Sequence, residues 1–329
     1  MREKLGLCEW FHHNDHARLT ASVARMHELQ VRQLRTGISW ADSHRPDGWA
    51  WLDELTDRLR GFEVLASFNF TPPSIAENGH INGPPRRLED FADFIEQTVE
   101  RFGDRFGWVE LWNEPNGRYY WDFLHSDPGW HKFGEMIRLA AARCRSIGKP
   151  CVLGGLAPAD PSFITLLHQR GCLEEVDAVS VHGFPSMWCS GNPDEPVLET
   201  AGGSEQRPGW DDPFRWRGWP QRIADFEAVA GGRPVWITET GLSTWDDAAG
   251  VPARHGAQVA ALRSAAEAPA DRVYWIGLQD LHPAREAIEG DHVDEHEYHL
   301  GLITSSGEAK PALAEFCRLM GAGADVEAV

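Results

Sequence analysis

The chain of 329 residues carries 31 Lys and Arg against 50 Asp and Glu, which gives a formal net charge of −19. This charge repels nucleic-acid phosphates and anionic membrane surfaces, so it argues against both as partners and favours a neutral or cationic substrate. A hydrophobic fraction of 42% with 25% charged residues is typical of a globular protein with a substantial core. The 15 Trp residues could stack on sugar rings or pack helices on strands.

The N-terminal sequence MREKLGLCEW lacks the apolar stretch of a signal peptide, and the chain has no apolar run long enough to span a membrane. We therefore expect a cytoplasmic protein, although a secreted protein without its leader would look the same. The cysteines show no CxxC spacing, which predicts buried free thiols. They are Cys8, Cys144, Cys151, Cys172, Cys189 and Cys317.

Short apolar runs alternate with amphipathic segments along the chain, as in repeated βα units with parallel strands. The predicted strands are residues 4–10, 31–40, 63–70, 108–113, 151–157, 178–182, 235–239 and 273–278. Helices are predicted at residues 15–29, 49–59, 88–102, 130–147 and 161–171. Eight such units without a Gly-rich nucleotide-binding turn favour an α/β fold with a (β/α)₈ (TIM) barrel over an open sheet.

One domain accounts for the length, because a barrel of this kind commonly needs 200 to 400 residues. We expect the barrel to span residues 1–320 and a flexible tail of small residues to follow at 321–329. Long irregular stretches at 184–220 and 282–299 follow the sixth and eighth strands, and loops of that length are more often functional than idle. The sequence leaves the oligomeric state open.

Two glutamates end predicted strands. Glu114 follows the fourth strand in WVELWNEPN (108–116), and Glu239 ends the seventh in VWITETG (235–241). Strand ends converge on one substrate in such a barrel, and glycoside cleavage needs one protonated and one ionised carboxyl group. A lone strand-end Glu is usually a solvated charge, but this pair predicts Glu114 as general acid/base and Glu239 as nucleophile. We expect a raised pKa for Glu114 and not for Glu239.

The sequence resembles glycoside hydrolase clan A, whose members carry Asn-Glu-Pro after strand four and a Glu after strand seven. This resemblance covers nearly the whole chain. Within the clan, the segment FTPPS (70–74) and the segments LGL (300–302) and KPA (310–312) are similar to family 39, the β-xylosidase and iduronidase group.

The resemblance implies roles for four further residues. Arg35 would keep Glu239 ionised, and Asn113 would bind the sugar 2-hydroxyl. His182 would lie close to the carboxyl pair, and Trp275 would form the floor of the −1 subsite. Taken alone, Arg35 could be a surface ion pair, and His182 a core group with satisfied hydrogen bonds.

This sequence departs from the clan pattern at Phe184. Clan A enzymes often carry a Tyr two residues after the strand-six His, with its hydroxyl on the nucleophile. Without that donor, Glu239 must be oriented by other groups.

Weaker candidates for sugar binding are the residues that end strands two and three, Trp40 and Asn69. In the loop after strand six, Trp188 could stack on sugar or pack within the loop. The same alternatives apply to three other loop tryptophans, Trp210, Trp216 and Trp219.

Two clusters contain residue types that bind metals. Residues 291–299 (DHVDEHEYH) could hold zinc or calcium, but their spacing matches no specific metal motif, so a polar sugar-binding loop is the better interpretation. Residues 12–16 (HHNDH) are interpreted in the same way, with Asn14 or Asp15 as a helix N-cap.

The function predicted from these patterns is hydrolysis of a β-linked glycoside with retention, through a covalent glycosyl-enzyme and without a cofactor or bound metal. A transglycosidase would use the same residues. A catalytically silent sugar-binding barrel is the alternative from another class, and the presence of both glutamates with Arg35 and Asn113 argues against it. The identity of the sugar stays open, although the net charge of −19 disfavours a uronide.

Overall fold

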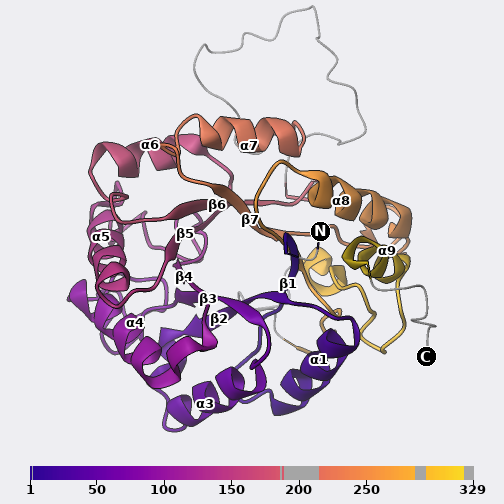
Figure 1. The fold of residues 1–329 in the computed structure, drawn as a ribbon, viewed down its shortest axis with the longest axis horizontal. Coiled ribbons are helices and arrows are strands. Elements are labelled where there is room, and N and C mark those ends of the chain that lie inside the picture. The colour runs from indigo at the N-terminus through magenta and orange to yellow at the C-terminus, as the bar shows by residue number, and fades with distance from the viewer. Residues whose placement is uncertain (2, 186, 189–214, 286–293, 322–329) are drawn as a thin grey trace, which may run out of the picture.

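The computed structural model describes residues 1, 3–185, 187–188, 215–285 and 294–321. Its centre is a closed barrel of parallel strands in the order β1-β10-β7-β6-β5-β4-β3-β2. The barrel strands are β1 (Leu5–Cys8), β2 (Gln33–Ser39), β3 (Glu63–Asn69), β4 (Trp108–Leu111), β5 (Cys151–Leu156), β6 (Ala178–Gly183), β7 (Val235–Thr240) and β10 (Val273–Ile276). Each predicted strand is present, so the predicted (β/α)₈ barrel is confirmed. Figure 1 shows the strands around the centre and the helices outside them.

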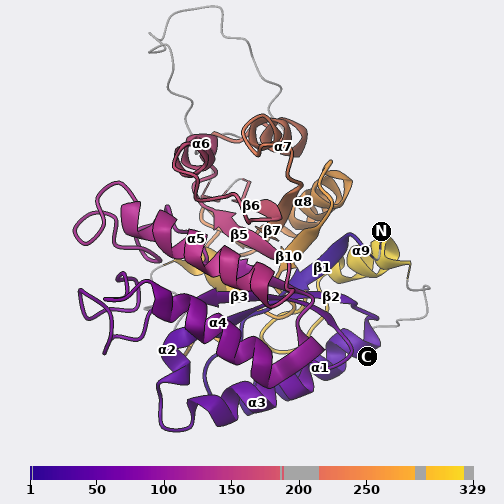
Figure 2. The same ribbon diagram turned by 60° about the vertical axis from the view of Figure 1, so that its left-hand side comes forward.

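The described helices form the outer layer around the barrel. Within this layer, α4 and α5 pack side by side (Figure 2). The α-helices are α1 (His16–Glu28), α2 (Trp40–Ser43), α3 (Gly48–Arg58), α4 (Glu89–Phe102), α5 (His131–Ser146), α6 (Pro161–Gln169), α7 (Trp219–Glu227), α8 (His255–Glu267) and α9 (Pro311–Met320). The smaller elements are the 3₁₀ helices η1 (Gly103–Arg105) and η2 (Glu295–His299) and the hairpin of β8 (Trp245–Asp246) and β9 (Val251–Pro252). The five predicted helices begin and end within two residues of α1, α3, α4, α5 and α6.

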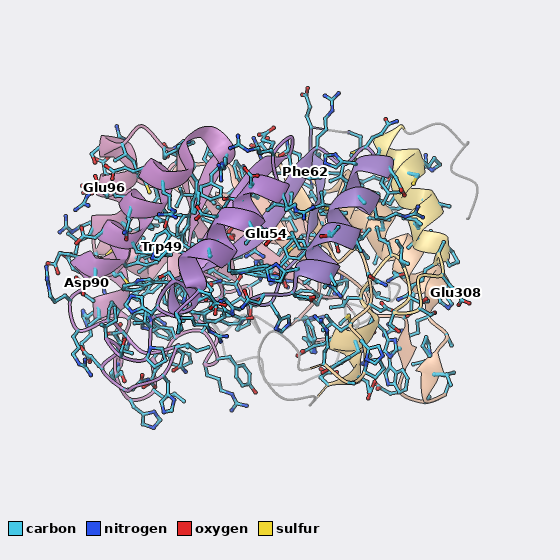
Figure 3. The ribbon with its side chains drawn as sticks, turned by 90° about the horizontal axis from the view of Figure 1, so that it is seen from below. Trp49, Glu54, Phe62, Asp90, Glu96 and Glu308 are labelled. Atoms are coloured by element: carbon cyan, nitrogen blue, oxygen red, sulfur yellow. The ribbon has the colours of Figure 1, made fainter. Side chains whose placement is uncertain are left out.

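Helix α4 attaches to the barrel through one apolar face. Its buried side chains recur every three or four residues, as an amphipathic helix requires. They are Phe91, Ala92, Phe94, Ile95, Thr98, Val99 and Phe102. Trp49 of α3 contacts Phe94 and Phe102, with ring centroids 6.2 and 6.3 Å apart. Figure 3 shows Trp49 beside these helices and the acidic side chain of Glu54 on the outer face of α3.

The barrel interior holds a second, smaller apolar cluster, separate from the main core between strands and helices. Its buried members are Cys8, Leu65, Val152, Ala178, Trp236 and Tyr274, and Trp10, Trp108 and Ile276 pack against it. Successive residues of a strand point to opposite faces, so each strand residue in this cluster shows which positions of its strand face inward. On β10 the inward residues are Tyr274 and Ile276, whereas Val273 and Trp275 belong to the outer core.

Parts of the predicted loops and tail lie outside the described residues, namely 186, 189–214, 286–293 and 322–329. Helix α9 ends at Gly321, whose φ of 63° suits a glycine. No helix within the described ranges is long and apolar enough to cross a membrane. The five described cysteines are buried and free, as predicted, and Cys189 lies outside the described residues.

Candidate active site

Glu114 and Glu239 meet at the carboxyl ends of the barrel strands. One carboxylate oxygen of each glutamate and one ring nitrogen of His182, in β6, lie within 4.8 Å of one another. Glu239 is 9% exposed, and the side chain of Glu114 is 14% exposed. The two carboxyl groups therefore face one small, largely desolvated space.

The loop that carries Glu114 is held from the neighbouring strand. Glu114 has a φ of 41°, a conformation that non-glycine residues rarely adopt, and its N–H donates to the Gly155 carbonyl of β5 at 3.0 Å. Asn116 accepts from the Ala157 N–H at 3.1 Å and donates to the Pro158 carbonyl at 2.6 Å. The Asn-Glu-Pro-Asn turn is thus fixed by hydrogen bonds to the β5 loop.

Arg35 is the central cation of the site and has no exposed surface. Its Nη1 donates to Oε2 of Glu239 at 2.7 Å, and its Nη2 donates to Oδ1 of Asn113 at 2.6 Å. Its Nε donates to Oε2 of Glu110 at 2.7 Å. The predicted contact of Arg35 with Glu239 is present, and the same guanidinium orients the Asn113 amide.

The protonation of Glu114 follows from burial. The pKa of Glu114 is raised to about 8: burial is the largest cause, Arg35 opposes it, and the nearby carboxylates of Glu110 and Glu297 add to it. Glu114 therefore holds its proton at neutral pH, as expected of a general acid.

The pKa of Glu239 is also raised by burial, which differs from the sequence-based expectation. The sequence could not show that the carboxyl group of Glu239 would be at least as enclosed as that of Glu114. Arg35 opposes the shift by donating directly to Glu239, and no such hydrogen bond from Arg35 to Glu114 is present among the described residues. This difference in partners favours ionisation of Glu239 before Glu114.

His182 is a neutral partner of Glu114. Burial lowers its pKa to about 4. Its Nδ1 lies 2.6 Å from Oε1 of Glu114, and its Nε2 lies 3.1 Å from Oγ1 of Thr238. A neutral imidazole has one donor and one acceptor nitrogen, so a protonated Glu114 donates to Nδ1 and leaves the ring proton on Nε2.

Gly155 makes room for this imidazole. A Cβ at Gly155 would lie 2.0 Å from Nε2 of His182, which no side chain tolerates. The His182 side chain can occupy its position only because residue 155 is a glycine. His182 lies beside the carboxyl pair, as the sequence predicted.

Asn69 ends β3 on the inward face and is fully buried. Among the described residues, neither its Oδ1 nor its Nδ2 has a hydrogen-bond partner. A buried amide without partners costs free energy unless something else satisfies it, so this amide is available to a bound polar ligand.

Two tryptophans do not lie where the sequence predicted. Trp275 is fully buried in the outer core, facing away from the barrel interior, so the expectation that it forms a subsite floor is wrong. Trp40 is 3% exposed and stacks on Phe94 of α4 at 5.7 Å, so it does not face the barrel mouth. The physical reason is local: Ser39 caps α2 by accepting from the Asp42 N–H, and the chain turns at Trp40.

The described tryptophans of the strand-six loop divide into two groups. Trp216 and Trp219 are buried and pack edge to face against each other, with centroids 5.0 Å apart, so packing is their role. Trp188 is 38% exposed, and its Nε1 donates to Asp294 at 2.6 Å. Only Trp188 in this group keeps a ring surface for sugar, and Trp210 lies outside the described residues.

Three site residues were missed from the sequence. Trp10 follows β1 and lies over Arg35, with 5.1 Å from the guanidinium carbon to the ring centroid, where Gly37 leaves space for the indole. Cys8 and Glu110 contact Arg35 from inside the barrel. Glu110 could have been found from the sequence, because it is a single carboxylate within the apolar run of β4. A buried charge needs a partner, so such a residue predicts an ion pair inside the barrel.

The two clusters considered for metal binding are engaged in local contacts. Asp294 accepts from the His296 N–H, and His299 stacks on Trp245 with centroids 5.1 Å apart. Residues 291–293 lie outside the described part. Asp15 caps α1 by accepting from the Arg18 N–H, as the sequence predicted for Asn14 or Asp15.

One group of described residues has donor atoms close enough to hold a metal ion, namely Glu114, His182 and Glu239. Arg35 already donates to Glu239 and would repel a second cation there. The arrangement is better suited to proton transfer and nucleophilic attack by two carboxyl groups.

The closed parallel barrel and the two glutamates at its strand ends define a (β/α)₈ barrel with a strand-end carboxyl pair. No protein-family model matches the chain, and no curated protein sequence matches it.

Solved structures with this fold include two family 39 glycoside hydrolases and a β-xylosidase. A family 39 glycoside hydrolase from Bacteroides cellulosilyticus WH2 is 17% identical over 98% of this chain, with a TM-score of 0.65. A monomeric β-xylosidase from Caulobacter crescentus CB15 is 19% identical over 96%, with a TM-score of 0.65. The GH39 enzyme from Xanthomonas axonopodis pv. citri is 16% identical over 97%, with a TM-score of 0.66. The matched part spans 64%, 67% and 66% of those three chains, respectively.

Proposed function

We propose that this chain is a retaining glycoside hydrolase that cleaves a β-linked glycoside through a covalent intermediate on Glu239. The observation that carries the proposal is the separation of the two carboxyl groups, whose nearest atoms lie within 4.8 Å. Retaining enzymes hold their carboxyl groups roughly 5 to 5.5 Å apart, whereas inverting enzymes need about 6.5 to 9.5 Å to admit a water molecule.

The first step is glycosylation. A carboxylate oxygen of Glu239 attacks the anomeric carbon and forms an ester, while the bond from that carbon to the leaving oxygen breaks. Glu114 donates its proton to the leaving oxygen, which departs as an alcohol. Arg35 keeps Glu239 ionised for this step, and Asn113, oriented by Arg35, is placed to bind the sugar 2-hydroxyl.

The second step is deglycosylation. Glu114, now a carboxylate, takes a proton from water, and the water oxygen attacks the anomeric carbon. The ester bond to Glu239 breaks, so the sugar leaves with its original configuration. Neutral His182 holds Glu114 in place through both protonation states, because an imidazole nitrogen can accept from the acid or donate to the carboxylate.

The substrate proposed is a neutral sugar. The described site holds one cation, Arg35, which is shared between two carboxylates, so it is not free to pair with the carboxylate of a uronide.

A panel of nitrophenyl glycosides tests the proposal: xyloside, glucoside, arabinoside and glucuronide, each as matched α and β anomers. We expect hydrolysis of a neutral β-glycoside, with a β-configured sugar as the first product by NMR. Cleavage of none of these, or a first product of α configuration, would refute it.

The pH dependence of cleavage has a defined sign. Glu114 must be protonated for glycosylation, and its pKa is raised to about 8. We therefore expect kcat/KM to fall as pH rises through about 8, with the basic limb absent in Glu114→Gln. A substrate with a strongly acidic phenol leaving group serves as the control, because it needs little proton assistance and its basic limb should flatten. A basic limb that is the same for both leaving groups would show that another residue sets it.

A further inference from the structure

Oε2 of Glu239 has a second neighbour besides Arg35. The Sγ atom of Cys8, in β1, lies 3.8 Å from this oxygen, within the range for a sulfur hydrogen bond. Cys8 is fully buried on the inward face of the barrel.

The contacts around Cys8 define the direction of its hydrogen bond. Nη1 of Arg35 donates to Sγ at 3.3 Å and to Oε2 of Glu239 at 2.7 Å. Sγ therefore already receives a hydrogen, and its own S–H has the carboxylate oxygen as acceptor. Burial raises the pKa of the Cys8 thiol well above its ordinary value, so the group stays a protonated donor and adds no negative charge beside Glu239.

We propose that Cys8 is a positioning residue for the nucleophile, whose thiol donates to Oε2 of Glu239 and holds that carboxylate in its attacking orientation. This inference rests on the proposed function of Glu239 and adds a second donor to its Oε2. Both donors, Arg35 and Cys8, act on Oε2. The geometry leaves Oε1 as the oxygen that attacks the anomeric carbon.

The expected consequence is a change in the ionisation of Glu239. Removing a donor to a carboxylate raises its pKa, and for one weak thiol donor we expect roughly 0.5 to 1 unit. The acid limb of kcat/KM in Cys8→Ala should move upward by that amount. The basic limb, which belongs to Glu114, should stay in place. The charged and titratable groups that face Glu239 are Arg35, Glu114 and His182, and Glu110 faces Arg35 and Cys8.

The matched control is Cys144→Ala. Cys144 is also a fully buried free cysteine, but it lies on α5 in the outer core. Loss of this thiol should lower stability about as much as loss of Cys8 and leave both limbs of the pH profile unchanged. An unchanged acid limb in Cys8→Ala, or an equal shift in Cys144→Ala, would overturn the proposal.

A spectroscopic measurement keeps the test independent of catalytic activity. The S–H stretching band of Cys8, assigned by comparing the infrared spectra of wild type and Cys8→Ala, reports its acceptor directly. We expect this band to shift in Glu239→Gln, because a neutral amide is a weaker acceptor than a carboxylate. The Cys144 band should not move. A Cys8 band that ignores the Glu239 substitution would overturn the inference even if the enzyme is active.

The two proposals fail in different ways. If the wild-type protein cleaves no glycoside but the Cys8 band shifts in Glu239→Gln, the catalytic function is wrong and the hydrogen bond stands. If the protein cleaves glycosides and neither the band nor the acid limb responds, the hydrogen bond is wrong and the catalytic function stands.

Discussion

Glu239→Ala should lose hydrolysis by roughly 10⁵-fold, because no other carboxylate in the described site can form the covalent intermediate. Added azide or formate should restore part of the rate by occupying the space of the missing side chain. With a β-glycoside, azide then attacks from the face opposite the leaving group, so the product should be the α-glycosyl azide. NMR of the product identifies the anomer.

Glu114→Ala is the matched control for this experiment, since it removes the other carboxyl and leaves Glu239 able to attack. An activated phenol should still be released rapidly in a first burst, after which the glycosyl-enzyme should accumulate. Azide should accelerate turnover and give the β-glycosyl azide of retained configuration. The same azide anomer from both variants, or wild-type activity in either, would contradict the assigned roles.

Arg35→Met should cost about 3 to 5 kcal/mol of stability at neutral pH, because it leaves Glu110 and Glu239 buried without their cation. Without Arg35 the pKa of Glu239 rises further in the folded state, because Arg35 now lowers it. When the pKa of a carboxyl is higher in the folded state than in the unfolded state, the folded protein becomes less stable as pH increases. The loss of stability of Arg35→Met relative to wild type should therefore be smallest near pH 4 to 5 and should grow toward pH 7. Urea unfolding at several pH values measures this dependence.

Arg222→Met provides the control for Arg35→Met. Arg222 is also buried, but it donates to the Ala159 carbonyl at 2.9 Å and lies over Trp216, away from the carboxyl pair. This variant should lose stability without the same pH dependence and should keep its activity profile. If both variants showed the same pH dependence of unfolding, Arg35 would not be the counterion of these carboxylates.

The fold could be predicted because each barrel strand is a short apolar run followed by an amphipathic helix. The predicted run at 31–40 contains β2 (Gln33–Ser39): it starts two residues early and ends one residue late, where Ser39 caps α2. The meeting of Glu114 and Glu239 was predictable for a related reason. A carboxyl directly after a buried apolar run lies at the strand end, and strand ends of a parallel barrel converge.

The orientation of Trp275 could not be predicted from the sequence. The strand segment VYWI is apolar at every position, so it carries no alternation that would show which residues face inward. The assignment of Trp275 to the site came from family resemblance alone. In the structure Tyr274 and Ile276 occupy the inward positions.

The interior charges were only partly predictable. Arg35 and Glu110 are each a lone charge within an apolar strand, and their 2.7 Å contact could have been anticipated from the cost of burying either one alone. The contact of Cys8 with Glu239 had no such signal, because a cysteine in an apolar strand is usually a packing residue. Only the three-dimensional register of β1, β2 and β7 brings that thiol to the carboxylate.

In the proposed mechanism, Glu239 forms an ester with the sugar. Incubation with an activated 2-deoxy-2-fluoro β-glycoside, which slows both steps but releases its good leaving group, allows that ester to accumulate. Intact-mass spectrometry should show the addition of one fluorosugar per chain, and peptide mapping should place it on Glu239 and find none in Glu239→Gln. An adduct on another residue, or steady turnover with no adduct and an inverted product, would contradict the account.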